Sequence, residues 1–176
     1  MLEKLKNFEN VTLEKAEYVE KQAERTLEFA MESRKLLTQE AHTTINWLFA
    51  IILGCSGYTA TLLESRHIPW WLVITLFFVT LISGWQAVSL FSISLTAREL
   101  IPPGNVPKNL ITDSMLQYDI KWIRLAESVT LQERIQLAQD HNHDSANAVN
   151  KSRWVIAFLP IIAIAIGIIS MIMIGV

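Results

Sequence analysis

The sequence predicts an all-α integral membrane protein with three transmembrane helices. Three stretches without Asp, Glu, Lys or Arg support this: residues 43–63, 68–97 and 154–176, which are 21, 30 and 23 residues long. The hydrocarbon core of a bilayer is about 30 Å thick and takes about 20 helical residues to cross. Hydrophobic residues make up 51% of the 176-residue chain, and the charges lie outside these stretches, unlike those of a soluble domain.

Residues 1–42 are expected to form a cytoplasmic amphipathic helix that continues without a break into the first transmembrane helix, residues 43–63. Neither Gly nor Pro occurs before Gly54, and Thr12 followed by Glu14 is typical of a helix N-terminus. The first 40 residues hold nine acidic and seven basic side chains. Because they contain no apolar signal region, we expect the first transmembrane helix to act as its own insertion signal.

The cytoplasmic part of this helix carries a heptad pattern built mostly from small residues. Its members are Ala16, Val19, Ala23, Thr26, Ala30, Ser33 and Leu37. A polar helix of this kind needs a partner in water. Two interpretations stay open: the pattern packs against the chain's own cytoplasmic segment, or copies of the helix pack together around an oligomer axis.

After a short external turn at residues 64–69, a second transmembrane helix is expected at 70–97. Residues 98–153 should form a cytoplasmic segment, with a proline-rich loop and then a helix capped by Thr112. The polar end of this segment either frays or continues as helix into the third transmembrane helix, residues 154–176. Pro160 should kink that last helix or mark its start.

The placement of Lys and Arg predicts the orientation. Residues 1–35 contain seven, the external turn contains one, residues 98–153 contain seven, and none follows. Cytoplasmic loops are enriched in Lys and Arg. We therefore expect a multi-pass protein of the inner (cytoplasmic) membrane, with the N-terminus in the cytoplasm and the C-terminus outside. Tryptophans fit both interfaces: Trp70 and Trp71 outside, Trp47 and Trp154 inside.

Polar side chains recur in the second apolar stretch, and three of them lie deep in the membrane: Thr80, Ser83 and Gln86. Ser and Thr can donate a hydrogen bond to the backbone one turn earlier, whereas Gln cannot satisfy its amide fully in this way. Gln86 therefore either joins two helices by a hydrogen bond or lines a water-filled path.

Each apolar stretch also contains a pair of small residues spaced four apart. Such pairs let helix backbones approach closely, so we expect helix packing at Ala50 and Gly54, at Ser83 and Ala87, and at Ala163 and Gly167.

A polar patch lies where the first helix enters the membrane. Glu40, His42 and Asn46 could gather protons or cations at the inner mouth of a pore, or the patch could simply be interfacial.

Two motifs around His141 could carry chemistry, and we expect neither to do so. His141, His143 and Asp144 lack the further ligands that a zinc site needs. The Arg134 to His141 spacing resembles the Arg-x(4–6)-His motif of HEPN ribonucleases. However, Ile135 stands where that family has a polar residue, and a helix would separate the two side chains by more than about 10 Å along its axis.

No phosphate loop, GxSxG or HExxH motif occurs, so we expect no enzymatic activity, no cofactor and no metal. The cytoplasmic segments carry net charges of −2 (nine acidic, seven basic) and 0 (seven of each), which does not favour binding to nucleic acid. The expected partners are the lipid bilayer and further copies of the chain.

Two functions fit these features. The first is a small homo-oligomeric membrane protein that forms or gates a pore or otherwise perturbs the membrane. The layout resembles that of small helical membrane effectors from bacterial or phage gene clusters. The second is a non-conducting membrane anchor or adaptor, whose cytoplasmic helices bind a partner protein.

Overall fold

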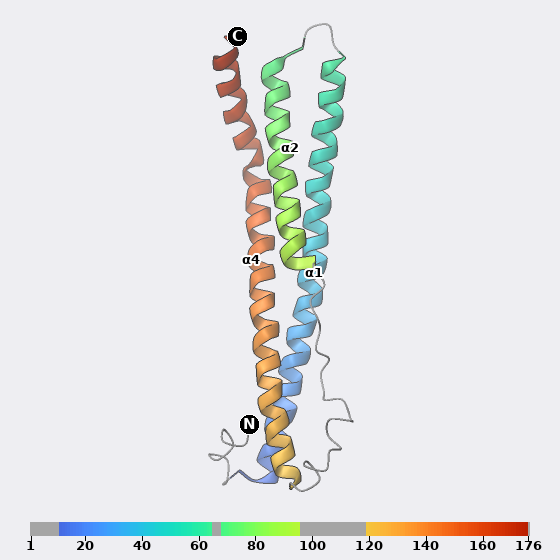
Figure 1. Ribbon diagram of the computed structural model, residues 1–176, viewed down its shortest axis with the longest axis vertical. Helices are drawn as coiled ribbons and strands as arrows, with labels where there is room; N and C mark the ends of the chain where they lie inside the picture. Colours follow the sequence, from blue (N-terminus) through green and yellow to red (C-terminus); the bar gives the residue numbers. More distant parts are fainter. Residues whose placement is uncertain (1–10, 65–67, 96–118, 176) are drawn as a thin grey trace. The chain divides into compact units, whose positions relative to one another are not determined.

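The computed structural model describes residues 11–64, 68–95 and 119–175 (Figure 1). The elements in order are α1 (Leu13–Leu63), α2 (Trp70–Leu90), the π-helical turn η2 (Phe91–Leu95) and α4 (Ile120–Ile174). The described residues contain helices and no strand, so the predicted all-α fold is confirmed.

Three helices are long and apolar enough to cross a membrane: Leu13–Leu63, Trp70–Ser94 and Ile120–Ile174. Each contains one of the three apolar stretches that the sequence predicts to span. Large apolar side chains lie exposed along these helices, with Leu53 71%, Trp85 73% and Met173 82% exposed. Such a surface is normal for helices that face lipid and is exceptional on a soluble protein.

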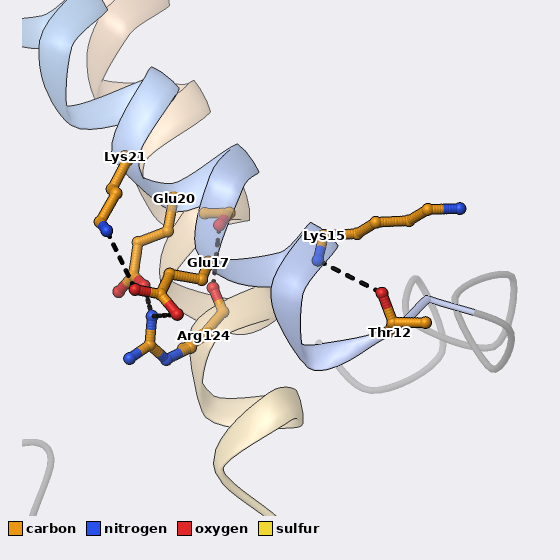
Figure 2. Close-up of polar contacts among 7 residues, drawn as sticks. Thr12, Lys15, Glu17, Glu20, Lys21 and Arg124 are labelled. Carbon is orange, nitrogen blue, oxygen red and sulfur yellow. Dashed lines mark hydrogen bonds and ion pairs between the residues drawn. The ribbon is translucent and has the colours of Figure 1, made fainter.

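The start of α1 follows from its capping residue. The N–H of Lys15 donates to Thr12 Oγ1 at 3.3 Å (Figure 2). The N–H of Ala16 donates to the Thr12 carbonyl at 3.0 Å. The first bond satisfies one of the N–H groups that a helix start leaves without partners, and the second is the first regular backbone bond of α1. From there α1 continues to Leu63, where the predicted first transmembrane helix also ends.

The second helix begins directly after a proline. The carbonyl of Pro69 accepts the N–H groups of Leu72 and Val73, at 2.9 and 3.2 Å. At its C-terminal end α2 continues into the π-helical turn η2, whose wider geometry interrupts the regular α-helix. The predicted end of this helix, at residue 97, lies outside the described residues.

The last helix, α4, runs through the polar stretch at 140–153 and through Pro160. Of the two alternatives for that stretch, the structure therefore shows continuous helix. Pro160 is exposed, so its ring points away from the helix contacts. The predicted proline-rich loop and the Thr112 cap lie outside the described residues.

The chain divides into two compact units, and the first comprises Met1–Lys35 and Arg98–His143. Within it, Ala16 packs with Leu125, and Leu27 packs with Leu131 and Ile135. The start of α1 thus packs against its own chain, which is the first of the two interpretations. The contact differs from the predicted heptad at two positions: Val19, 47% exposed, and Thr26 are both exposed. Leu27, 2% exposed, lies in the contact next to Thr26. The larger apolar side chain turns inward because its burial releases more free energy.

The second unit comprises Leu36–Ala97 and Asp144–Val176. Its helices lie side by side (Figure 1), and all three meet in one cluster formed by Ala41 and Ile45 of α1, Leu90 of α2 and Val149 of α4. The inward face of α2 is a stripe with helical spacing: Thr75, Val79, Ser83, Ala87 and Leu90. All the candidate site residues predicted from the sequence lie in this unit.

Candidate functional site

The three deep polar residues of α2 differ in their surroundings. Thr80 is half-buried, and its Oγ1 donates to the Leu76 carbonyl at 2.9 Å. Ser83 is 0% exposed, and Gln86 is half-buried. Since successive residues turn by 100°, Thr80 and Gln86 lie about 60° to either side of Ser83. The inward stripe of α2 therefore passes through Ser83, and the other two residues border it.

Ser83 is unusual because its Oγ is buried with no hydrogen-bond partner among the described residues. Thr75, on the same stripe, instead donates to the Trp71 carbonyl at 2.7 Å. A buried hydroxyl without a bond is unfavourable. Ser83 is thus the least satisfied polar group on this face of α2.

Gln86 brings a polar side chain to the surface of the single chain at membrane depth. It lies 16 residues beyond Trp70, which corresponds to about 24 Å along α2. Because the residue is only half-buried, part of its side chain can reach a neighbouring molecule. An amide facing hydrocarbon is costly, so Gln86 is suited to contact with protein or water.

The small-residue pairs occupy two kinds of position. In α2 and α4 they lie at contacts within the chain: Ala87 is 5% exposed, and a Cβ on Gly167 would stand 3.5 Å from Thr75 Oγ1. In α1 they lie outside: Ala50 and Gly54 are exposed, and a Cβ on Gly54 would meet nothing within 4 Å. Ala163 is half-buried. The close approach at Gly167 brings α4 against α2.

The three residues of the predicted inner mouth do not converge within one chain. Glu40, His42 and Asn46 are all exposed. His42 and Asn46 lie about 40° apart around the helix, whereas Glu40 lies about 160° from His42. The carboxylate of Glu40 accepts a hydrogen bond from Nη2 of Arg153 on α4. Glu40 therefore belongs to a contact between α1 and α4.

Beside this ion pair lies a groove of about 280 Å³, which we call the Arg153 groove. Its lining residues are Thr43, Thr44, Trp47, Arg153, Ile156 and Ala157. Arg153 and Glu40 are half-exposed, at 50% and 51% of their side chains. Thr44 is 2% exposed and its Oγ1 donates to the Glu40 carbonyl at 2.8 Å. The groove is thus lined by one charged residue, Arg153, together with two threonines and apolar side chains, and Glu40 lies beside it as the partner of Arg153.

A second groove, of about 400 Å³, lies between α1 and α2 and includes Thr59, Ala60, Trp70, Phe77 and Thr80 in its lining. We call it the Ala60 groove. No residue that lines it carries a charge, so it offers only hydroxyl groups and apolar surface.

In the first unit, an ion-pair cluster joins α1 to α4 (Figure 2). Arg124 Nη1 lies 2.9 Å from Glu20 Oε2 and 3.8 Å from Glu17 Oε2, and Lys21 Nζ lies 3.0 Å from Glu17 Oε1. The hydrogen bond and charge of Lys21, followed by the charge of Arg124, lower the pKa of Glu17. Burial raises the pKa of Glu20 despite the nearby Arg124, and the charges of Glu24 and Glu127 act in the same direction.

The helical geometry also separates the residues around His141. His141 is 6% exposed, whereas His143 and Asp144 are exposed on other sides of α4. No group of three or more potential metal ligands occurs in the described part of the chain. The neighbouring Asn142 donates from Nδ2 to the Ala30 carbonyl at 2.8 Å. This stretch of α4 therefore contributes packing and a hydrogen bond to α1.

Sequence reasoning missed the Arg153–Glu40 contact, although a signal for it exists. Glu40 is the last charged residue before the first apolar stretch, and Arg153 is the last before the third. Because both helices pass from charged into apolar sequence in the chain direction, these two residues come to the same level. The signal becomes usable once α1 and α4 are known to be neighbours.

Comparisons of the chain with protein-family models, with curated proteins and with solved structures found no match. The functional argument accordingly depends on the residues and contacts described above.

Proposed function

We propose that the protein is a non-enzymatic, homo-oligomeric membrane protein whose assembled copies form or gate a pore or otherwise perturb the membrane. In this proposal the three apolar helices span the inner membrane, with the N-terminus in the cytoplasm and the C-terminus outside. The distribution of Lys and Arg supports that orientation.

The position of Gln86 carries the proposal. Its half-buried side chain lies within the apolar helix α2, four residues before its end at Leu90, where a polar group is stable only against protein or water. Another copy can supply a hydrogen-bonding group, and several copies together can enclose water. Both arrangements require assembly, because three helices of one chain leave Gln86 at the surface.

The outer face of α1 offers a surface for such an assembly. Gly54 and Gly57 are exposed, and a Cβ on either would meet nothing within 4 Å. Small residues on a lipid-facing helix allow another helix to approach closely. A copy packed there would gain van der Waals contacts that lipid chains cannot match as well.

The test combines oligomer mass with ion flux. We expect the purified chain to run as an oligomer in mild detergent and to release a trapped ion from liposomes. Gln86→Leu should lower the flux at least several-fold, because a narrow apolar constriction closes by dewetting. Ser89→Ala, close to the end of α2, is the matched control and should leave flux unchanged. A monomer without flux would contradict the proposal.

One observation favours the adaptor function as a second candidate. Tyr18 and Phe29 are 65% and 70% exposed on the charged part of α1. They lie 11 residues apart, within about 20° of the same face, and about 180° from the buried Leu27. Exposed aromatic residues of this kind are typical of protein interfaces. Two results together would favour this function. The parent protein would form an oligomer without ion flux, and the Tyr18→Ser and Phe29→Ser double variant would keep the oligomer mass and the helicity.

A further inference from the structure

We propose that the Arg153 groove binds one zwitterionic phospholipid with a primary ammonium group, such as phosphatidylethanolamine. The proposal requires the apolar helices to be inserted in a bilayer, and it is independent of pore formation and of oligomer size. It rests on the position of the groove, on the charges of Arg153 and the adjacent Glu40 and on its volume.

The groove lies at the level where lipid headgroups meet acyl chains. Glu40 and Arg153 are the last charged residues before uncharged stretches of 21 and 23 residues. Two tryptophans accompany them: Trp47 and Trp154, which are 61% and 64% exposed. Exposed Trp beside a boundary charge is characteristic of the membrane interface.

The charged and apolar parts of the groove follow one another on the same helix faces. On α1, Glu40 and Trp47 lie within about 20° of each other around the helix axis. On α4, Arg153 and Ala157 lie about 40° apart, and both line the groove. A molecule with a charged head and an apolar tail can therefore lie along the groove, with its tail directed toward the membrane centre.

The paired charges select a headgroup of both signs. Arg153 alone would suit an anionic lipid, but the carboxylate of Glu40 bonds to it and would repel a second anion. A phosphate can bind the exposed half of Arg153 while an ammonium binds the exposed half of Glu40. The headgroup thereby adds two charge-assisted contacts and leaves no charge unbalanced.

The ammonium should be primary, because the side-chain oxygens of Glu40 and Thr43 beside it can accept hydrogen bonds. Thr43 lines the groove, and its Oγ1 uses its proton in a bond to the Gln39 carbonyl at 3.0 Å. The lone pairs of that oxygen, like those of Glu40, are left to accept hydrogen bonds. A primary ammonium supplies three N–H donors, whereas the quaternary ammonium of phosphatidylcholine supplies none.

The volume of about 280 Å³ lies slightly below that of ordinary ligand pockets, which measure about 300–1,000 Å³. It can hold a headgroup and the first part of one acyl chain, while the rest of the lipid stays in the bilayer. A bound lipid would cover Trp47, Ile156 and Ala157.

The experiment measures lipid retention on the full chain by native mass spectrometry. The probes are phosphatidylethanolamine, phosphatidylcholine and phosphatidylglycerol with identical acyl chains. We expect the chain to bind phosphatidylethanolamine about tenfold more tightly than phosphatidylcholine, as one charge-assisted hydrogen bond predicts. Equal retention of all three lipids, or retention of none, would overturn the proposal.

Three variants locate the site. Glu40→Gln should reverse the preference toward phosphatidylglycerol, because Arg153 then faces an anion alone. Ala157→Trp should remove the preference by filling the groove without changing the ion pair. Ala60→Trp is the matched control in the Ala60 groove and should keep the preference. If Ala157→Trp proves unstable, the reversal of lipid preference by Glu40→Gln still tests the site. An unchanged lipid preference in both Glu40→Gln and a folded Ala157→Trp would reject the site.

Discussion

At the scale of single residues, Ser83 is a position in α2 where the chain tolerates an unfavourable group. Its Oγ is buried without a hydrogen bond among the described residues, on the inward stripe of α2. Replacing it with Ala removes only an unsatisfied hydroxyl. Thr75, on the same stripe, has a bonded hydroxyl and provides the comparison.

We expect Ser83→Ala to leave the free energy of unfolding unchanged or to raise it by about 1 kcal/mol. Thr75→Val should instead lower it by about 0.5–1 kcal/mol, since a bonded hydroxyl is lost. Chemical unfolding in detergent, followed by helicity, measures both. A loss for Ser83→Ala as large as that for Thr75→Val would contradict the description of the Ser83 hydroxyl as unsatisfied.

Glu17 and Glu20 approach the same Arg124, yet their pKa values move in opposite directions. Because its pKa is raised, Glu20 stabilises the folded state fully below its ordinary pKa of about 4.3. This stabilisation is lost as the pH rises through the folded-state pKa. Because its pKa is lowered, Glu17 stabilises the folded state above its ordinary pKa. This stabilisation is lost as the pH falls through the folded-state pKa.

The first unit should therefore become more stable as the pH falls from neutral toward the ordinary Glu pKa, and less stable below it. Glu20→Gln should abolish the gain of stability between neutral pH and the ordinary Glu pKa, and it should retain the loss below that pKa. Hydrogen exchange of residues 13–35, corrected for the intrinsic exchange rate at each pH, measures this. An identical pH profile in Glu20→Gln would contradict the assignment of that gain of stability to Glu20.

At the scale of elements, two glycines separate packing within the chain from packing between copies. A Cβ at Gly167 would already lie in van der Waals contact with Thr75 and Trp71 of α2, so a larger side chain would press on them. A side chain at Gly54 would meet open space. Gly167→Leu should thus force α4 from α2 and cost about 1–3 kcal/mol of stability. Gly54→Leu should keep the stability and reduce the oligomer mass.

Thermal unfolding and light scattering in mild detergent distinguish the two glycine variants. Gly84→Leu, at another open position, controls for added bulk on a helix. Full oligomer mass in Gly54→Leu would exclude this face of α1 as the contact between copies.

The end of α1 at Leu63 and the start of α2 at Trp70 could be predicted, because the limits of long uncharged runs are local signals. The register of the contact between α1 and α4 could not. Ala16 and Ala30 belong both to the predicted heptad and to the observed buried face, but Leu27 replaces Thr26 between them. A pattern of small residues leaves two adjacent registers nearly equal. The choice depends on Leu131 and Ile135, which lie more than 100 residues away in the chain.

The candidate site was predictable in its residue types and not in its geometry. Gln86 and Ser83 are conspicuous as polar residues in an apolar helix, but burial of one and partial exposure of the other depend on neighbouring helices. Glu40 is conspicuous beside His42 and Asn46. Its contact with Arg153 follows only from α4 being the neighbour on that side.

At the scale of the whole molecule, the proposed orientation has a direct test. Reporter fusions at Met1 and Val176 should report the cytoplasm and the external side, respectively, because three membrane crossings separate the ends. A fusion after Leu63, in the short turn, should also read as external. If both ends report the cytoplasm, one helix does not cross, and the proline-containing α4 is the first to examine.

In the proposed membrane orientation, Pro160 makes the shape of α4 depend on the thickness of the bilayer. Proline has no backbone N–H to donate, so α4 lacks one backbone hydrogen bond within its apolar stretch. The helical residues of α1 and α2 contain no proline. In a thinner bilayer, an apolar helix must tilt or bend to keep its surface covered. In the proposed membrane orientation α4 can bend at Pro160, so lipid chain length would affect the angle of the helical residues that follow it.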